Sequence, residues 1–275
     1  MKPDYKNWMP RGLLYTMFGS AALFGLLTVL VTWGPIPMSG TIKTVLAGVL
    51  SGATLFLCAV SCWMLWLYRM FSYTGKKQIA RRIINGVADH VHIPDGGKGL
   101  DVGCGSGALT IACAKRNPNA TMTGIDYWGL QYASFSQILC ESNALAENTP
   151  NVVFQRGDAR KLDFPDETFD IVTSNYVFHD IYGTSRQALV LETLRTLKKG
   201  GTFVIHDFMP HYLYGDLDAF AEKLRGMGYR DVQIIDTAHG KFITRWEALS
   251  LFLCHSTLLT GRNLFCAKNN NKSNE

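Results

Sequence analysis

The chain has 275 residues, of which 47% are hydrophobic, and its formal net charge is +5. This composition excludes an intrinsically disordered chain, a collagen-like chain and a coiled coil. The charge is unevenly distributed: residues 1–82 contain nine Lys and Arg and one acid, and the remaining residues have a net charge of −3. A negatively charged body disfavours binding to nucleic acid. The seven scattered Cys indicate reduced thiols rather than disulfides, and no metal site is expected.

Two uncharged apolar runs open the chain, Leu13–Trp33 and Thr44–Tyr68. Each is long enough for the ~20 apolar residues that a membrane-spanning helix needs. The Gly- and Pro-rich segment 34–40 between them predicts a turn. Lys and Arg lie outside the pair and only Lys43 lies near the turn, so the positive-inside rule predicts a transmembrane hairpin with both flanks in the cytoplasm.

Two other interpretations of the apolar front are a cleaved signal peptide and a buried pair of helices in a soluble protein. A signal peptide usually has a shorter apolar core and a small-residue cleavage pattern, which this segment lacks. We assign residues 1–70 to a tail and a two-helix transmembrane hairpin, residues 71–267 to a globular domain, and residues 268–275 to a disordered tail. Gly48 and Gly52 are expected to let the two helices approach closely.

Beyond the hairpin, strand-like and helix-like segments alternate along the chain. The predicted strands are 98–102, 121–125, 151–155, 169–174, 202–206 and 232–235. The predicted helices are 74–91, 108–116, 130–147, 186–197 and 216–227. This alternation predicts an α/β fold, a doubly wound, mostly parallel sheet with helices on both faces. In such sheets the ligand binds beyond the carboxyl ends of the strands.

The predicted strand ends carry groups that suit an adenosine. A carboxylate suits the ribose diol, an aromatic ring suits the base, and a second carboxylate with a neighbouring amide suits the exocyclic amine and a ring nitrogen. In that order these groups are Asp126, Tyr127 or Trp128, Asp158 and Ala159.

The segment Leu100–Gly107 resembles the first motif of class I S-adenosylmethionine-dependent methyltransferases of the small-molecule type. Further segments resemble the motifs that follow: Gly124–Asp126, Gly157–Ala159, Phe169–Asn175 and Leu197–Ile205. The resemblance covers about Phe71 to Arg262. It implies a Rossmann-like seven-stranded sheet, closed by an antiparallel strand at 256–262.

The resemblance also implies S-adenosyl-L-methionine as the cofactor and a set of residues that bind it. Asp101 and the glycine loop would hold the methionine part, Asp126 the ribose, and Asp158 and Ala159 the adenine. A lid like that of the family's small-molecule members would include Tyr73. The full predicted set is Tyr73, Asp101, Gly103, Gly105, Gly107, Asp126, Tyr127, Asp158, Ala159 and Asn175.

A competing interpretation is a nicotinamide dinucleotide site, because Gly103, Gly105 and Ala108 fit its glycine fingerprint. Asp101 argues against it. A carboxylate two residues before the first glycine would repel a pyrophosphate but suits a cationic methionine end.

His179, just beyond the fourth predicted strand, is the candidate general base, and Tyr176 is a candidate positioning or acceptor-binding group. The alternative for His179 is a ring that caps the following turn. His206 and Asp207, at the end of the fifth strand, are expected to be structural. The apolar stretch 237–254 is interpreted as core packing, with a cover for the acceptor or a membrane-facing surface as alternatives.

The sequence therefore predicts a membrane-anchored methyltransferase with its domain on the cytoplasmic side. It would transfer methyl groups by in-line displacement to a small, apolar acceptor such as a quinone, isoprenoid, lipid or thiol. One alternative is a tethered enzyme with a water-soluble acceptor, and a minor one is a non-catalytic cofactor-binding regulator. The predicted partners are the acceptor and the lipid bilayer, with no nucleic acid, and the oligomeric state stays open.

Overall fold

The computed structural model describes residues 2–129 and 133–264. They form two compact units, a hairpin unit of residues 7–80 and a globular unit of residues 2–6 and 81–264. The hairpin unit thus ends ten residues later than the predicted boundary, and residues 2–6 belong to the globular unit. The predicted disordered tail at 268–275 lies outside the described residues.

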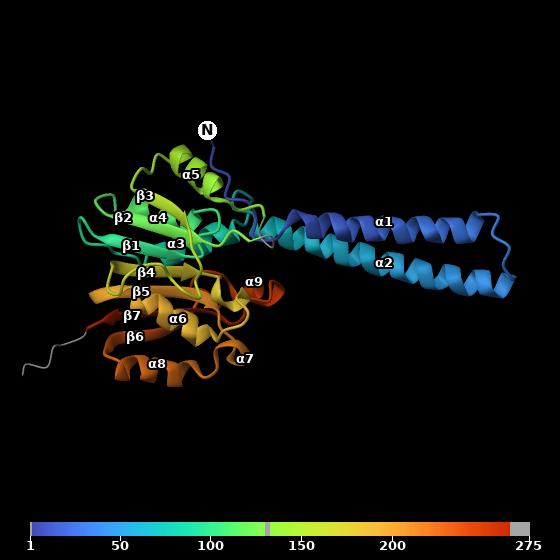
Figure 1. The fold of residues 1–275 in the computed structure, drawn as a ribbon. Coiled ribbons are helices and arrows are strands. Elements are labelled where there is room, and N and C mark those ends of the chain that lie inside the picture. The colour runs from blue at the N-terminus through green and yellow to red at the C-terminus, as the bar shows by residue number, and fades with distance from the viewer. Residues whose placement is uncertain (1, 130–132, 265–275) are drawn as a thin grey trace, which may run out of the picture. The chain divides into compact units, whose positions relative to one another are not determined.

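The hairpin unit consists of α1 (Arg11–Trp33) and α2 (Gly40–Phe71), which run side by side in opposite directions (Figure 1). Gly25 faces Thr54, because a Cβ added at Gly25 would lie 3.6 Å from the Thr54 methyl group. Gly48 and Gly52 do not make the predicted close approach: apart from the backbone of α2 itself, no described atom lies within 4 Å of a Cβ placed at either. Gly25, a small residue at this contact, is on α1.

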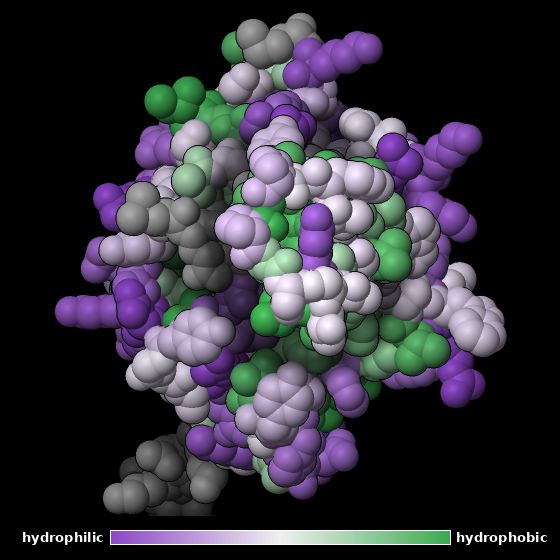
Figure 2. All heavy atoms as spheres, turned by 90° about the vertical axis from the view of Figure 1, so that its right-hand side faces the viewer, coloured by the Kyte–Doolittle hydropathy of each residue, from purple (hydrophilic) through white to green (hydrophobic). Residues whose placement is uncertain are grey.

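The outer surface of the hairpin unit is apolar. Leu55 and Phe56 of α2 are 71% and 68% exposed, and the hairpin is mostly green and white when viewed from its loop end (Figure 2). Six hydroxyl groups of the helices donate to the carbonyl oxygen four residues earlier: those of Thr16, Thr28, Thr32, Thr44, Thr54 and Ser61. Both helices are long and apolar enough to cross a membrane.

The globular unit is built on a seven-stranded sheet with the order β3-β2-β1-β4-β5-β7-β6. The strands are β1 (Lys98–Val102), β2 (Thr121–Asp126), β3 (Val152–Arg156), β4 (Phe169–Asn175), β5 (Leu197–Phe208), β6 (Tyr229–Asp236) and β7 (Ser256–Asn263). β7 is antiparallel to β5 and β6, and the other neighbouring strands are parallel. The predicted mostly parallel sheet with an antiparallel closing strand is confirmed.

Helices cover both faces of this sheet (Figure 1). They are α3 (Ile79–Ala88), α4 (Ala108–Arg116), α5 (Gln137–Ala146), α6 (Arg186–Arg195), α7 (His211–Tyr214), α8 (Leu217–Gly226) and α9 (Arg245–Ser250), with a 3-10 turn η2 (Phe178–Asp180). α5 begins later than predicted because Ser136 caps it and accepts a hydrogen bond from the Leu139 amide.

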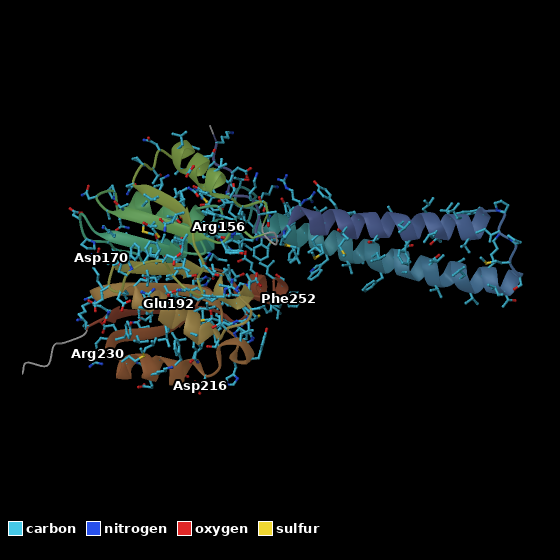
Figure 3. The ribbon with its side chains drawn as sticks, in the orientation of Figure 1. Arg156, Asp170, Glu192, Asp216, Arg230 and Phe252 are labelled. Atoms are coloured by element: carbon cyan, nitrogen blue, oxygen red, sulfur yellow. The ribbon has the colours of Figure 1, made fainter. Side chains whose placement is uncertain are left out.

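The core lies between the sheet and these helices. Leu100, Val172 and Phe203, from three neighbouring strands, are fully buried in it. Arg156 ends β3 and Asp170 stands near the start of β4, and Figure 3 shows them at opposite edges of the sheet. The edge with Arg156 is the carboxyl edge, where the ligand of such a sheet binds.

Candidate active site

The glycine loop after β1 depends on backbone conformations that favour glycine. Gly103, Gly105 and Gly107 have φ values of +76°, +56° and +80°. A Cβ at Gly103 would lie 2.4 Å from Val177, and one at Gly107 would lie 2.9 Å from Phe154. At Gly105 the nearest atom would be 3.6 Å away, on Phe135. Gly103 and Gly107 are therefore packed closely against neighbouring elements, whereas Gly105 leaves room for a ligand to approach the backbone.

Asp126 joins the end of β2 to this loop. One carboxylate oxygen accepts a hydrogen bond from the Gly105 amide at 2.9 Å, and the other accepts one from the Trp128 amide at 2.7 Å. The Trp128 indole in turn donates to the Gly105 carbonyl oxygen at 2.9 Å. Burial raises the pKa of Asp126, and the backbone donors oppose this shift. Each carboxylate oxygen keeps a lone pair that can accept a ribose hydroxyl.

Asp101 is buried beneath the loop. The hydroxyl groups of Thr110 and Thr173 donate to its carboxylate at 2.6 and 3.1 Å. Burial raises its pKa to about 6, although both hydroxyl hydrogen bonds lower it. Its predicted contact with the methionine part stays a prediction, because the structure places this carboxylate in the interior next to the loop.

The predicted adenine end contains two arginines that the sequence interpretation did not use. The Arg156 guanidinium lies 4.9 Å from the centre of the Tyr127 ring. Arg160 donates to both oxygens of Asp158, and this ion pair lowers the pKa of Asp158. Ala159 is buried. Asp158, which is predicted to accept a hydrogen bond from the exocyclic amine, is thus already ion-paired with Arg160.

The acceptor side of the carboxyl edge contains a histidine–carboxylate pair. His179 in η2 has its Nδ1 atom 2.5 Å from a carboxylate oxygen of Asp207, at the end of β5. Asp207 is buried and also accepts hydrogen bonds from the His179 amide, the Phe208 amide and the Tyr214 hydroxyl. Because a carboxylate only accepts, Nδ1 carries the proton and Nε2 is left as the basic nitrogen.

The surroundings of His179 favour its protonated form. Burial of the ring lowers its pKa. The hydrogen bond and negative charge of Asp207, together with the charge of Asp180, raise the pKa by more than burial lowers it. Arg186 opposes them and donates to the His179 carbonyl oxygen at 2.9 Å. The net result is a pKa above the ordinary histidine value. This pairing sharpens the prediction for His179 and identifies Asp207 as the residue that orients it.

Tyr176 and Asn175 have partners on the same edge. The Tyr176 hydroxyl lies 2.5 Å from the Ser256 hydroxyl, and its ring is 4.7 Å from the His206 ring in an edge-on arrangement. The Asn175 side-chain oxygen lies 2.8 Å from Nδ1 of His206. Burial lowers the pKa of His206 to about 3, so this ring is neutral at physiological pH and serves as structure.

The N-terminal segment meets the glycine loop through α5. The Asn143 side chain accepts a hydrogen bond from the Asp4 amide at 2.7 Å and donates to the Asp4 carbonyl at 3.1 Å. The same amide group donates to the Ser106 carbonyl at 3.0 Å. Asn143 is buried, so it joins residue 4 to the loop. Tyr73 belongs to the hairpin unit, and its role in binding the cofactor stays a prediction.

The chain has relatives among known proteins. Residues 100–205 match the family model for a methyltransferase domain. Over 159 residues the chain is 27% identical to 27-O-demethylrifamycin SV methyltransferase of Amycolatopsis mediterranei, covering 58% of this chain and 56% of that protein. Over 124 residues it is 30% identical to a sterol 24-C-methyltransferase of Gibberella zeae, covering 45% and 30%. The chain spans about half the length of the first curated relatives it matches.

Among solved structures, the cyclase SpnF has a TM-score of 0.51 and 21% sequence identity, over 68% of this chain and 83% of that chain. At this identity the likeness concerns the fold alone.

Proposed function

We propose that this chain, which carries a class I S-adenosylmethionine-dependent methyltransferase domain, transfers a methyl group to a small acceptor at the cytoplasmic surface of a membrane. The observation that carries the proposal is the pairing of His179 with buried Asp207 next to the glycine loop. The His179–Asp207 pair lies next to the glycine loop because Val177, which leads into η2, packs against Gly103.

The residues of the carboxyl edge fit the cofactor. Gly105 leaves space at its Cα, although its amide and carbonyl are hydrogen-bonded to Asp126 and Trp128. Asp126 offers acceptors for a diol, and Asp101 supplies negative charge. Among the described residues no Lys, Arg or His forms an ion pair with Asp101, so a cationic ligand would stabilise its charged form. S-adenosylmethionine supplies a methyl group on a positively charged sulfur.

His179 is the residue that moves a proton. An acceptor hydroxyl or amine becomes a stronger nucleophile when Nε2 of His179 removes its proton. Asp207 holds the ring in the required tautomer and stabilises the imidazolium that results. The Tyr176 hydroxyl is bonded to Ser256, so we assign the ring of Tyr176, rather than its hydroxyl, to the wall that positions the acceptor.

Three observations support membrane anchoring by the hairpin unit. Its large apolar side chains are exposed, unlike those of a core helix pair. Six of its hydroxyl groups donate to carbonyl oxygens of their own helices, as hydrocarbon surroundings favour. Residues 2–6 and 81–264 belong to one unit, so both flanks of the hairpin end on the same side. Together with the basic flanks this favours a cytoplasmic globular unit.

An apolar acceptor is the favoured substrate class because a hairpin in the bilayer holds the domain where such molecules dissolve. One relative is named a sterol methyltransferase, which is consistent with this class. A water-soluble acceptor with the hairpin as a simple tether is the second candidate. A cofactor-binding regulator without turnover is the third.

Incubating membranes that contain the full chain with methyl-tritiated S-adenosylmethionine tests the proposal. We expect label in the organic extract, and roughly 10²- to 10⁴-fold slower labelling with His179→Ala. Label confined to the aqueous extract would favour a water-soluble acceptor, with the hairpin as a simple tether. Binding of the cofactor without any transfer would favour a regulator without turnover. Release of the full-length chain by carbonate extraction would contradict anchoring by the hairpin.

A further inference from the structure

The helix α9 and the turn after it expose large apolar side chains. Trp246 is 80% exposed, Leu249 is 58% exposed and Phe252 is 67% exposed. We call these three residues the α9 patch. Phe252 also has a φ of +58°, a conformation that costs a bulky side chain energy and is kept where the surroundings require it. The interpretation of this stretch as core packing is therefore wrong for these three side chains, although Ala248 and Leu251 are buried.

Two of the three exposed residues of α9, Trp246 and Leu249, are apolar, and the third is Arg245. Its other charged residue, Glu247, turns inward, is buried and forms an ion pair with Arg82 at 2.6 Å. Glu247 also completes a capping box with Thr244, which fixes the start of the helix. A helix anchored by its acid and exposing Trp and Leu is built to present an apolar surface outward.

Along the chain, the exposed Lys and Arg nearest to the α9 patch follow the exposed Asp236. Residues 237–256 contain two exposed cations, Lys241 and Arg245, and one acid, Glu247, which Arg82 neutralises. An apolar centre with a basic border complements a bilayer that contains anionic lipids. Trp is also favoured at the boundary between headgroups and hydrocarbon.

The chain keeps the globular unit close to the bilayer. The helix α2 ends at Phe71 and α3 begins at Ile79, so seven residues connect the two helices. Fully extended, such a connection spans about 25 Å. The start of α3 is therefore held within about 25 Å of the end of the hairpin that is proposed to be anchored in the membrane.

We infer that the α9 patch rests in the interfacial layer of the membrane and holds the carboxyl edge of the sheet toward it. The inference rests on the proposed anchoring, and it adds a second membrane contact made by the globular unit itself. Such a contact would place the site where an apolar acceptor leaves the lipid.

Full chain in vesicles of phosphatidylcholine and phosphatidylglycerol tests this inference. The emission of Trp246 is obtained by subtracting the spectrum of Trp246→Phe from that of the unchanged chain. We expect this difference emission to be quenched by lipids brominated near the headgroup and protected from aqueous iodide. The bromolipid quenching should weaken when phosphatidylglycerol is omitted.

A tryptophan at the opposite end of β6 serves as the matched control. Met227 precedes β6, whereas α9 follows it, and Met227 is also exposed. In the Trp246→Phe background, Met227→Trp should be quenched by iodide and not by brominated lipid. Comparing the two positions separates a specific contact from a general closeness to the vesicle.

Two results would overturn the inference. Iodide quenching of Trp246 without bromolipid quenching would place the α9 patch in water. Protection from both quenchers would indicate a protein contact, such as a second copy of the chain. Flotation of the unchanged chain with the vesicles is measured first, so that a failure of hairpin anchoring is recognised separately.

Discussion

The two halves of the sheet build their parts of the site in different ways. In the cofactor half, β1, β2 and β3, the backbone predominates: three glycines with positive φ and two backbone amides that donate to Asp126. In the acceptor half, β4, β5 and β7, side chains pair with each other, as in His179 with Asp207 and Tyr176 with Ser256. In the proposed site, the backbone path of the first half would hold the cofactor, and a few replaceable side chains of the second half would carry out the chemistry.

The largest effect is expected in the acceptor half. Replacing His179 with Ala removes the proposed base and should lower turnover by roughly 10²- to 10⁴-fold. Binding of S-adenosylhomocysteine, measured by calorimetry, should not change. His239 is the matched control, because it also lies beside a carboxylate, that of Asp236, but on an exposed turn. Unchanged turnover in His179→Ala would mean that this half contributes no base.

The cofactor half is tested by making the same substitution, Gly to Ala, at two positions of the glycine loop. Both Gly103→Ala and Gly105→Ala place a side chain at positive φ, at a cost of about 1–2 kcal/mol each. Only at Gly103 would the new methyl group also collide with Val177, for about 1–3 kcal/mol more. We expect a larger loss of thermal stability in Gly103→Ala, and a larger loss of S-adenosylhomocysteine affinity in Gly105→Ala, whose methyl group would occupy the space left for the ligand. Equal losses of stability would show that packing against Val177 does not matter.

A smaller effect is expected from Asp207→Asn, which keeps the shape and removes the charge. Turnover depends on neutral His179, so in the unchanged chain it rises with pH through the raised pKa of this ring. Without the carboxylate the pKa falls, and the acidic limb of the pH profile should move to lower pH. The plateau should drop roughly 10- to 100-fold, the value of one charged hydrogen bond of about 1.5–3 kcal/mol. An acidic limb at unchanged pH would show that Asp207 does not raise the pKa of His179.

The sequence predicted the fold of the cofactor half well because its information is local. The glycines, Asp126 and the strand before them lie within 30 residues, and their spacing alone predicts a strand, a turn and a helix. The predicted ends of helices and strands were less accurate where a single residue determines where the element begins or ends. The helix predicted from residue 74 begins at Ile79, and the turn predicted at 198–201 lies inside β5.

The acceptor half was harder to predict because its partners are distant in sequence. Asp207 was expected to be structural, and nothing in its neighbours indicates a contact with a ring 28 residues earlier. Only the adjacency of β4 and β5 brings the two ends together. Arg160 was overlooked for a different reason: it follows Asp158 by two residues, and a short ion pair of this kind has no sequence pattern of its own.

The hydrogen bonds between Asp4 and Asn143 change how the hairpin is classified. Because residues 2–6 and 81–264 form one unit, the hairpin is an insertion within the globular unit rather than an extension at its end. Asp4, which precedes the hairpin, can form its hydrogen bonds only after Asn143, 139 residues later, has been synthesised. During translation both helices therefore leave the ribosome before the N-terminal segment has a docking site. The N-terminal segment can therefore dock only after both helices of the hairpin and α5 have been synthesised.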